Sequence, residues 1–272
     1  MQSTICLSIR NIDQQQAEVL MALLSEEEFE AFEETENGLE AYISEEKFDE
    51  SAAKAIISNY TSDISIHVHA PRNWNAEWEQ QYRPVVVEDI IGIRAVFHPP
   101  LENVQTEIII TPKMSFGTGH HATTWQMLKM MSELDFRGWN VFDYGTGTGV
   151  LAVFAELLGA GKVLAMDIDD WCIENTIENA SVNQCESILA TQGTVPPSDE
   201  DFDCILANIN RHILLENMDA MAGCLKKEGL LLISGFYAEE NHLLITAAEK
   251  QGMVLEKNSE KSGWSCLQFR KK

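Results

Sequence analysis

A glycine-rich loop in the middle of the sequence stands between two elements that suit nucleoside binding. Residues 140–142 are short and largely apolar and predict a strand, and residues 150–158 predict a helix. A second predicted strand, residues 162–166, ends at Asp167, about 20 positions beyond the first glycine. A carboxylate at that place in a βαβ unit binds ribose hydroxyls, so we predict that Asp167 is a ribose ligand. The loop contains Gly145, Gly147 and Gly149.

The residues around these glycines distinguish two cofactor classes. A dinucleotide fingerprint has Gly or Ala three positions after its second glycine, where this sequence has Val150. Asp143 precedes the loop, and a carboxylate facing a pyrophosphate in a partly buried site would lose on the order of 1 kcal/mol to repulsion. S-adenosylmethionine (AdoMet) carries an ammonium and a sulfonium instead of phosphates. We therefore predict an AdoMet site with Asp143, Gly145 and Gly147 as cofactor contacts; a nicotinamide cofactor and a purely structural loop are the alternatives.

An asparagine ends a later strand of the same series. Asn208 follows the predicted strand at 202–207, and ligands of open α/β sheets bind beyond the carboxyl ends of the strands. Methyl transfer needs a neutral amine, and a lysine with a pKa near 10.4 is neutral in about one part in a thousand near pH 7.4. The Asn208 carbonyl can accept a hydrogen bond from such an amine. We predict Asn208 as the catalytic residue, with a helix-capping role as the alternative.

The residues after Asn208 favour a flexible alkyl amine over a planar nitrogen. Sites that methylate amide or adenine nitrogens usually follow the asparagine with Pro-Pro-aromatic, which stacks on the flat group. Ile209, Asn210 and Arg211 provide no such platform.

Composition limits the partners and the location. The chain has 272 residues, of which 45% are hydrophobic, enough for one or two packed domains. Its net charge of −24 argues against direct nucleic-acid binding, since phosphate contacts need clustered Lys and Arg; it favours a basic protein partner, with simple solubility as the alternative. Neither a run of 18 apolar residues nor a signal-peptide pattern occurs. We predict a cytoplasmic protein that does not contact a membrane.

Cysteines and histidines do not indicate a metal site. The adjacent histidines His120 and His121 would point apart, without an acid-rich ligand pattern, so we assign them to a loop and expect no metal. The six cysteines show neither paired metal spacing nor a dense disulfide pattern, and we expect most of them to be reduced thiols: Cys6, Cys172, Cys185, Cys204, Cys224 and Cys266.

Residues 1–70 predict a small α+β domain, and residues 71–84 predict an aromatic helical linker. The acidic runs at 26–28 and 33–36 are either a docking surface for a basic protein or solvated edges. Trp74, Trp78 and Tyr82 recur four apart in the linker and form one apolar stripe. The domain's βαββαβ order is a known supersecondary pattern, with strands expected at 5–9, twice within 29–43 around a turn at 36–38, and at 64–69, and helices at 14–24 and 49–60.

Residues 85–272 predict an α/β domain with a mostly parallel sheet that ends in an antiparallel hairpin. Beyond the two strands around the glycine loop, strands are expected at 85–87, 91–97, 107–110, 188–190, 202–207, 230–234, 254–257 and 264–269. Helices are expected at 171–183, 213–225 and 242–251. A terminal hairpin is typical of AdoMet methyltransferases.

Four segments resemble the PrmA family, the bacterial methyltransferases of large-subunit ribosomal protein eleven. They are NWNAEWEQQYRPV, MSFGTGHHATT, FDYGTGTGVLA with MDID, and LANIN. The resemblance covers essentially the whole chain and implies a ferredoxin-like recognition domain, a linker and a class I (Rossmann-like) methyltransferase domain. It further implies that Thr124, Gly145, Asp167 and Asn208 contact AdoMet, and that a loop over the methionine end is formed by Phe116, Gly117, Thr118 and Gly119.

This sequence departs from the family pattern at two places. The family usually reads FGTGTHPTT, where this chain has His120 for Thr and Ala122 for Pro, and we expect that change to loosen the loop. The common Asn-Ile-Leu becomes Asn208, Ile209 and Asn210, which we expect to alter how the acceptor amine is held.

The residues and the resemblance together predict an AdoMet-dependent protein N-methyltransferase. Its expected substrate is large-subunit ribosomal protein eleven, modified at lysine or the N-terminal amine, and we expect a monomer. The alternatives are methyl transfer to another protein or to a small-molecule amine, a nicotinamide-dependent oxidoreductase, and a non-catalytic AdoMet-binding protein.

Overall fold

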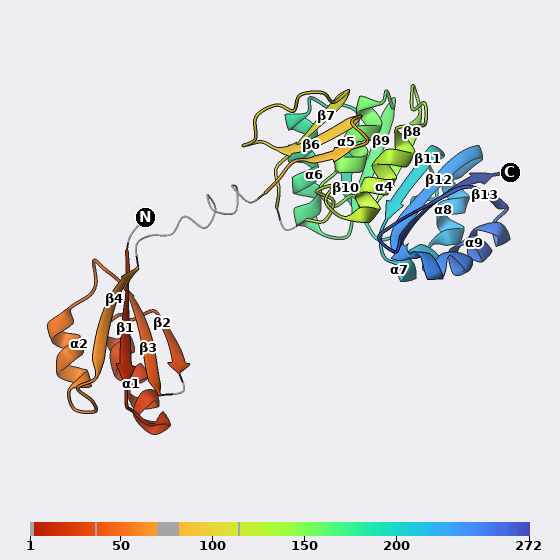
Figure 1. Cartoon of the computed structure of the whole chain (residues 1–272). Coiled ribbons are helices and arrows are strands. Elements are labelled where there is room, and N and C mark those ends of the chain that lie inside the picture. Colours follow the sequence, from red (N-terminus) through yellow and green to blue (C-terminus); the bar gives the residue numbers. More distant parts are fainter. Residues whose placement is uncertain (1–2, 36, 70–81, 114) are drawn as a thin grey trace. The chain divides into compact units, whose positions relative to one another are not determined.

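The chain forms two compact units, residues 1–81 and 82–272, in a computed structural model (Figure 1). The structure describes residues 3–35, 37–69, 82–113 and 115–272. Trp74 and Trp78 of the expected aromatic linker lie outside these residues, so the linker and the exact domain boundaries stay predictions.

The first unit has the expected βαββαβ order and an antiparallel sheet with strand order β2-β3-β1-β4. Alternate residues of β1, including Leu7 and Ile9, pack against Leu20 and Leu24 of α1 in one buried cluster. A capping box starts α1, because the Asp13 side chain accepts a hydrogen bond from the Gln16 backbone. The elements are β1 (Thr4–Arg10), α1 (Gln14–Glu26), β2 (Ala31–Thr35), β3 (Gly38–Ser44), α2 (Glu50–Ile57) and β4 (Ile64–His69).

The second unit is built on a seven-stranded sheet with the order β10-β9-β8-β11-β12-β14-β13. The first five strands in this order, from β10 to β12, pair in parallel. Strand β14 is antiparallel to both of its neighbours and forms the expected hairpin with β13. The strands are β8 (Asn140–Tyr144), β9 (Lys162–Asp167), β10 (Ile188–Gln192), β11 (Phe202–Asn208), β12 (Leu225–Tyr237), β13 (Met253–Lys261) and β14 (Trp264–Lys271).

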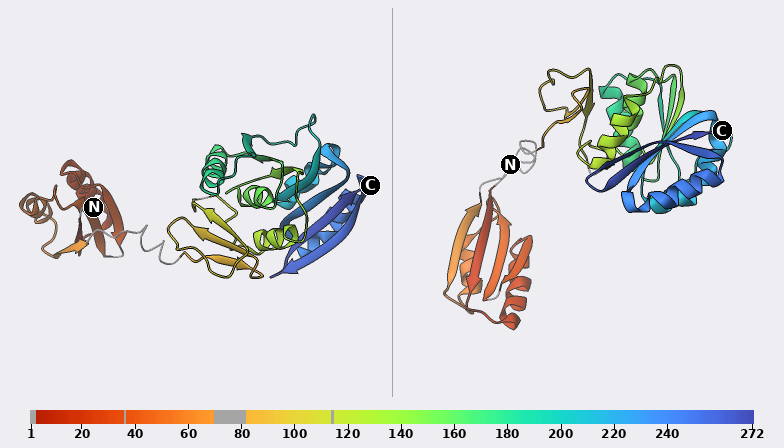
Figure 2. Two further views of the ribbon diagram at one scale, coloured as in Figure 1. Left: turned by 90° about the horizontal axis from the view of Figure 1, so that it is seen from above. Right: turned by 45° about the vertical axis from the view of Figure 1, so that its right-hand side comes forward.

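Helices cover both faces of this sheet (Figures 1 and 2). Successive strand residues point to opposite faces, so Val141 belongs to one buried cluster and Phe142 to the other. The first cluster contains α4 (Ala122–Met131) and α5 (Val150–Leu157), next to α6 (Asp170–Val182). The second contains α7 (Arg211–Glu216), α8 (Met218–Cys224) and α9 (Asn241–Lys250), the last preceded by the short 3₁₀ helix η1 (Ala238–Glu240).

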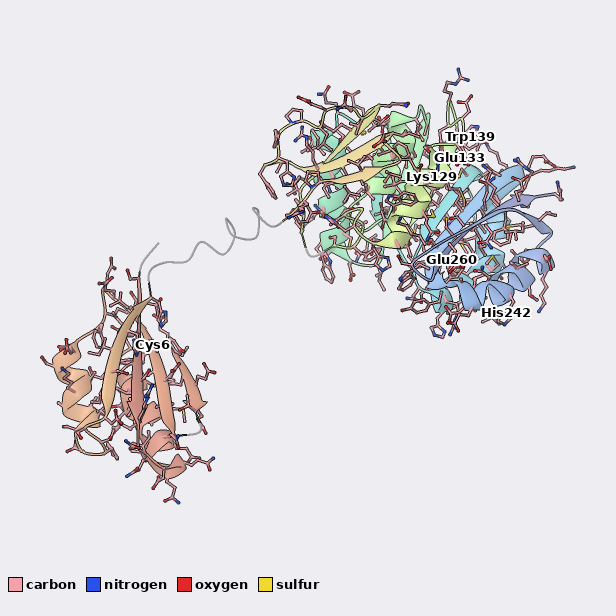
Figure 3. All side chains as sticks on the ribbon, in the orientation of Figure 1. Cys6, Lys129, Glu133, Trp139, His242 and Glu260 are labelled. Atoms are coloured by element: carbon pink, nitrogen blue, oxygen red, sulfur yellow. The ribbon has the colours of Figure 1, made fainter. Side chains whose placement is uncertain are left out.

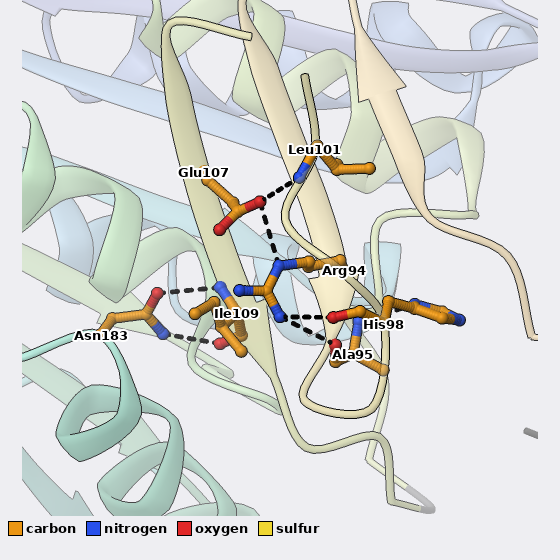
Figure 4. Close-up of polar contacts among 7 residues, drawn as sticks. All are labelled: Arg94, Ala95, His98, Leu101, Glu107, Ile109 and Asn183. Carbon is orange, nitrogen blue, oxygen red and sulfur yellow. Dashed lines mark hydrogen bonds and ion pairs between the residues drawn. The ribbon is translucent and has the colours of Figure 1, made fainter. Parts of the chain in front are cut away.

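A small three-stranded sheet forms a further layer over α4 and α5. It consists of β5 (Val85–Val87), β6 (Ile91–Ala95) and β7 (Thr106–Ile110), and its apolar residues belong to the cluster of α4 and α5. Figure 4 shows its polar contacts: Arg94 Nε lies 3.0 Å from Glu107 Oε1, and the Asn183 amide binds both backbone groups of Ile109. Asn183 thereby joins β7 to the end of α6.

Two expectations about the elements need correction. The helix expected at 213–225 is two helices, α7 and α8, interrupted at Asn217, whose side chain donates a hydrogen bond to the Ile213 carbonyl. The apolar pattern runs through this break, so periodicity does not reveal it. Strand β12 also begins at Leu225 rather than at residue 230, and α4 has no counterpart among the expected elements.

All six cysteines are free thiols, as expected, and Cys185 is the one that is partly exposed. Figure 3 labels the buried Cys6 on β1. Among the described residues, no helix combines the length and apolarity needed to cross a membrane.

Candidate active site

The loop between β8 and α5 depends on glycine at every second position. Gly145, Gly147 and Gly149 have φ angles of 78°, 57° and 78°, a region that other residues rarely adopt. A Cβ atom on Gly147 would lie 2.2 Å from the Phe116 carbonyl oxygen, and one on Gly145 would lie 2.1 Å from the Ile209 side chain. The glycines therefore allow two distant segments to approach the loop closely.

Asp167 stands at the end of β9 beside this loop. Its Oδ2 accepts a hydrogen bond from the Gly147 N–H at 2.9 Å, and its Oδ1 accepts one from the Asp169 N–H at 3.2 Å. These bonds hold the carboxylate in place. Each oxygen keeps a second lone pair, so Asp167 can still accept two hydroxyl hydrogen bonds.

Asn208 stands at the end of β11 with one side-chain atom unpaired. Its Nδ2 donates to Thr124 Oγ1 at 3.2 Å, while its buried Oδ1 has no hydrogen-bond partner within the described part of the chain. The next helix is capped by Asn210 instead, whose Oδ1 accepts from the Ile213 N–H. The capping alternative for Asn208 is therefore wrong. A buried side-chain oxygen without a partner is uncommon in folded proteins, and it marks Asn208 as a candidate site residue.

A cavity of about 630 Å³ opens at this edge of the sheet, a volume typical of small-molecule sites. It is lined by Ser115, Phe116, His121, Thr123, Tyr144, Gly145, Gly147, Asp167, Ile168, Asp169, Trp171, Cys172, Gly193, Thr194, Asn208, Ile209, Asn210, Ile213, Gly235 and Trp264.

The structure brings part of the expected set to the cavity wall, namely Phe116, Gly145, Gly147, Asp167 and Asn208. The remainder of the expected set does not line the cavity: Thr124, Asp143, Gly117, Thr118 and Gly119. The loop that carries Phe116 is held from behind, since the Thr148 hydroxyl donates to the Gly117 carbonyl and the Thr148 N–H to the Phe116 carbonyl. Which of these residues touch a cofactor stays a prediction.

Asp143 is the main correction to the expected site. We predicted a cofactor contact, but its side chain is fully buried under the glycine loop and does not line the cavity. Its Oδ2 accepts hydrogen bonds from Thr146 Oγ1 at 2.7 Å and from the Ala152 N–H at 3.2 Å. Burial raises the pKa of Asp143 to about 7, against the lowering effect of those two hydrogen bonds and with a smaller raising effect from the charge of Asp167. Asp143 thus stabilises the loop through its hydrogen bonds with Thr146 and Ala152.

Several lining residues were outside the expected set. Ile168 and Trp171 are 61% and 53% exposed, although both are large and apolar. An apolar residue directly after a strand-ending acid is a local signal that could have identified Ile168. Trp264 and Gly235 reach the cavity through the pairing of β14 and β12, for which the local sequence offers no signal.

His120, a departure from the family pattern, binds the loop rather than loosening it. Its Nε2 lies 2.8 Å from the Arg83 carbonyl oxygen and its Nδ1 lies 3.1 Å from Thr118 Oγ1. The ring also packs edge-on against Tyr82, at 4.9 Å between centroids. His120 therefore connects the loop of Phe116 to the first residues of the second unit.

The sheet order, the glycine loop and the acid at the end of β9 define a class I methyltransferase fold. A crystal structure of ribosomal protein L11 methylase from Lactobacillus delbrueckii subsp. bulgaricus matches it with a TM-score of 0.65 and 27% identity, covering 70% of this chain and 100% of that chain. The family model "Ribosomal protein L11 methyltransferase (PrmA)" matches residues 2–272. The chain belongs to this family.

Two relatives that bear the name "Ribosomal protein L11 methyltransferase" align over nearly the whole chain. The protein of Porphyromonas gingivalis is 41% identical over 260 residues, which cover 93% of this chain and 90% of the relative. The protein of Phocaeicola vulgatus is 37% identical over 260 residues, covering 93% and 92%. The resemblance to the PrmA family is therefore confirmed, and the oxidoreductase alternative is set aside.

The raised pKa of Asp143 predicts a pH-dependent stability. The Asp143 carboxyl ionises near pH 3.9 in the unfolded chain and near pH 7 in the folded chain. Its contribution to the free energy of unfolding is therefore complete below about pH 4 and is lost as the pH rises to about 7. Relative to Asp143→Asn, the free energy of unfolding of the parent protein should fall by up to about 4 kcal/mol across that window.

Urea denaturation of both proteins between pH 4 and pH 9 measures this difference. The difference in free energy of unfolding between the two proteins should change up to about pH 7. Above that value it should stay constant, because Asp143 is then ionised in both the folded and the unfolded chain. A difference that is the same at every pH would show that burial does not perturb this carboxyl.

Proposed function

We propose that this protein transfers methyl groups from AdoMet to amine nitrogens of ribosomal protein L11. The observation that carries the proposal is the buried Asn208 Oδ1, which has no hydrogen-bond partner in the described part of the chain and belongs to a residue that lines the cavity. A hydrogen-bond acceptor at that place suits the N–H of an amine. Membership in the PrmA family and the names of the relatives support the same reaction and substrate.

The residues of the cavity fit AdoMet. Asp167 has free lone pairs for two ribose hydroxyls, and Gly145 and Gly147 allow close approach of the backbone. The exposed side chains of Ile168 and Trp171 line the same end and offer apolar surface to a purine. When bound, AdoMet supplies a methyl group on a sulfonium sulfur, and its transfer to an amine leaves a thioether.

Asn208 would orient the acceptor amine. Thr124 Oγ1 accepts from its Nδ2, which turns Oδ1 away from Thr124 and leaves it to accept a hydrogen bond from the amine. The nitrogen lone pair is then directed by that bond, while the ammonium proton goes to solvent before the amine binds. Catalysis of this kind depends mainly on positioning, which is worth several orders of magnitude in rate.

The first unit would recognise the protein substrate. Its acidic residues at 26–28 and 33–34 are exposed, and a chain of net charge −24 attracts a basic ribosomal protein over a distance of about 10 Å in 0.1 M salt. We further propose that the enzyme works as a monomer in the cytoplasm, where ribosomal proteins are made, and that it binds the protein directly rather than the ribosomal RNA.

Replacement of Asp167 tests the cofactor site. Asp167→Ala should weaken AdoMet binding at least about 100-fold, because hydrogen bonds to a charged group contribute roughly 1.5–3 kcal/mol each. Isothermal titration calorimetry measures the affinity, with Asp201→Ala as the control, an exposed aspartate that does not line the cavity. Equal affinity of the parent protein and Asp167→Ala would refute the assignment.

Replacement of Asn208 tests the acceptor site. Asn208→Ala should lower kcat for ribosomal protein L11 by about 100-fold or more, the usual effect of removing one positioned hydrogen-bond group, with a smaller change in AdoMet affinity. Thr124→Val should lower kcat in the same direction, and Thr124→Ser should restore it because the hydroxyl is retained. Asn258→Ala, on the exposed face of β13, is the matched control. A normal kcat in Asn208→Ala would contradict the proposed role.

A further inference from the structure

The segment before α4 carries Phe116 on the wall of the cavity and has little support of its own. Its residues 115–121 form no helix or strand, and Gly117 and Gly119 have φ angles of 111° and 89°. Fixing such residues costs conformational entropy, so contacts with the rest of the chain must hold the segment in place. We call residues 115–121 the Phe116 loop.

The inner side of the Phe116 loop packs against the glycine loop. The Thr148 N–H donates to the Phe116 carbonyl at 2.9 Å, and the Thr148 hydroxyl donates to the Gly117 carbonyl at 2.9 Å. A Cβ atom on Gly117 would lie 2.7 Å from Thr148 Oγ1, so the two segments approach closely. These contacts hold Phe116, which is 53% exposed, at the cavity wall.

The outer side of the loop packs against the small sheet and the chain that enters it. A Cβ atom on Gly119 would lie 2.5 Å from the Ile93 side chain of β6. The neighbouring His120 is exposed, and its Nε2 donates to the Arg83 carbonyl at 2.8 Å. Because a carbonyl oxygen only accepts, Nε2 carries the ring hydrogen, and Nδ1 is left to bond the Thr118 hydroxyl at 3.1 Å.

A second histidine anchors the segment that His120 bonds. His98 Nε2 donates to the Tyr82 carbonyl at 2.7 Å, while His98 Nδ1 accepts from the Ala95 N–H at 3.2 Å. The backbone of His98 is held in turn by Arg94, whose side chain donates to the His98 carbonyl at 3.0 Å (Figure 4). The chain that enters the second unit is therefore fixed to the small sheet at the point where His120 reaches it.

From these contacts, and resting on the proposed AdoMet site, we propose that His120 is a positioning residue of the cofactor site. It ties the Phe116 loop to the anchored residues 82–83, and it thereby holds Phe116 and Gly117 in place before the cofactor binds. A loop that is bonded on both its inner and its outer side loses less conformational entropy when AdoMet binds, which raises the affinity for AdoMet.

Hydrogen exchange of the Thr148 amide, measured without AdoMet, reports how often the loop opens, because this N–H bonds the Phe116 carbonyl. His120→Ala should speed the exchange about tenfold, the effect of losing one or two hydrogen bonds. His120→Gln should exchange within about twofold of the parent rate, because its amide reaches as far as Nε2 and keeps a donor for the Arg83 carbonyl. His120→Asn is shorter by one methylene and should behave like His120→Ala.

Calorimetry and kinetics connect the loop to the cofactor. His120→Ala should weaken AdoMet binding about five- to tenfold but change kcat at saturating AdoMet less than about twofold, because the bound cofactor restores the loop. His120→Gln should restore the affinity. His242→Ala is the matched control, since His242 is an exposed histidine of α9 that bonds one carbonyl and does not line the cavity (Figure 3).

A proline at residue 122 should replace what His120 contributes. Ala122 is the first residue of α4, where proline is favoured, and its N–H donates no hydrogen bond within the described residues. The preceding His121 is extended, with a ψ angle of 142°, which suits a residue before proline. Ala122→Pro should therefore stiffen the loop in the His120→Ala background and return the exchange rate and the AdoMet affinity to within about threefold of the parent values.

Exchange of the Thr148 amide at the parent rate in His120→Ala would overturn the anchoring of the loop. Faster exchange with unchanged AdoMet affinity, or a lost affinity that Ala122→Pro does not restore, would overturn the positioning role. Failure of the parent protein to bind AdoMet would instead overturn the proposed function, and the exchange rates would still decide whether His120 anchors the loop.

Discussion

The tight turn after β8 is the constraint on which the site depends. Gly145, Gly147 and Gly149 adopt left-handed backbone conformations, and side chains at the first two would collide with Ile209 and Phe116. Because these glycines have no side chains, the Gly147 N–H can donate a hydrogen bond to Asp167, and the Thr148 N–H can donate one to the Phe116 carbonyl. One short loop thus fixes the acid at the end of β9 and the segment that closes the cavity from the other side.

The edge of the sheet organises the remaining chemistry. Parallel strands deliver Asp167, Gly145 and Asn208 to one edge of the sheet. Trp264 on the antiparallel β14 also lines the cavity, but it pairs with Tyr237, three residues beyond the Ser234 that lies opposite Asn208. A carboxylate and a neutral amide at this edge suit a ligand that offers hydroxyl and N–H donors.

Much of this arrangement is predictable from the residues, and what is not has identifiable causes. The glycine spacing and the apolar strands around it predict the βαβ unit, and with it Asp167 and Asn208 at strand ends. The sequence does not reveal whether the Asp143 carboxylate points into the cavity or beneath the loop, because a strand-end residue can do either, and packing under α5 decides. Trp264 reaches the site through long-range pairing with Tyr237, which no local pattern encodes.

The most direct test of the account is methyl transfer from labelled AdoMet to ribosomal proteins isolated from cells that lack this enzyme. Mass spectrometry then identifies the labelled proteins and the modified groups. The account predicts label in ribosomal protein L11, with added mass on lysine or the N-terminal amine. Label in a different protein, or none despite measurable AdoMet binding, would contradict it.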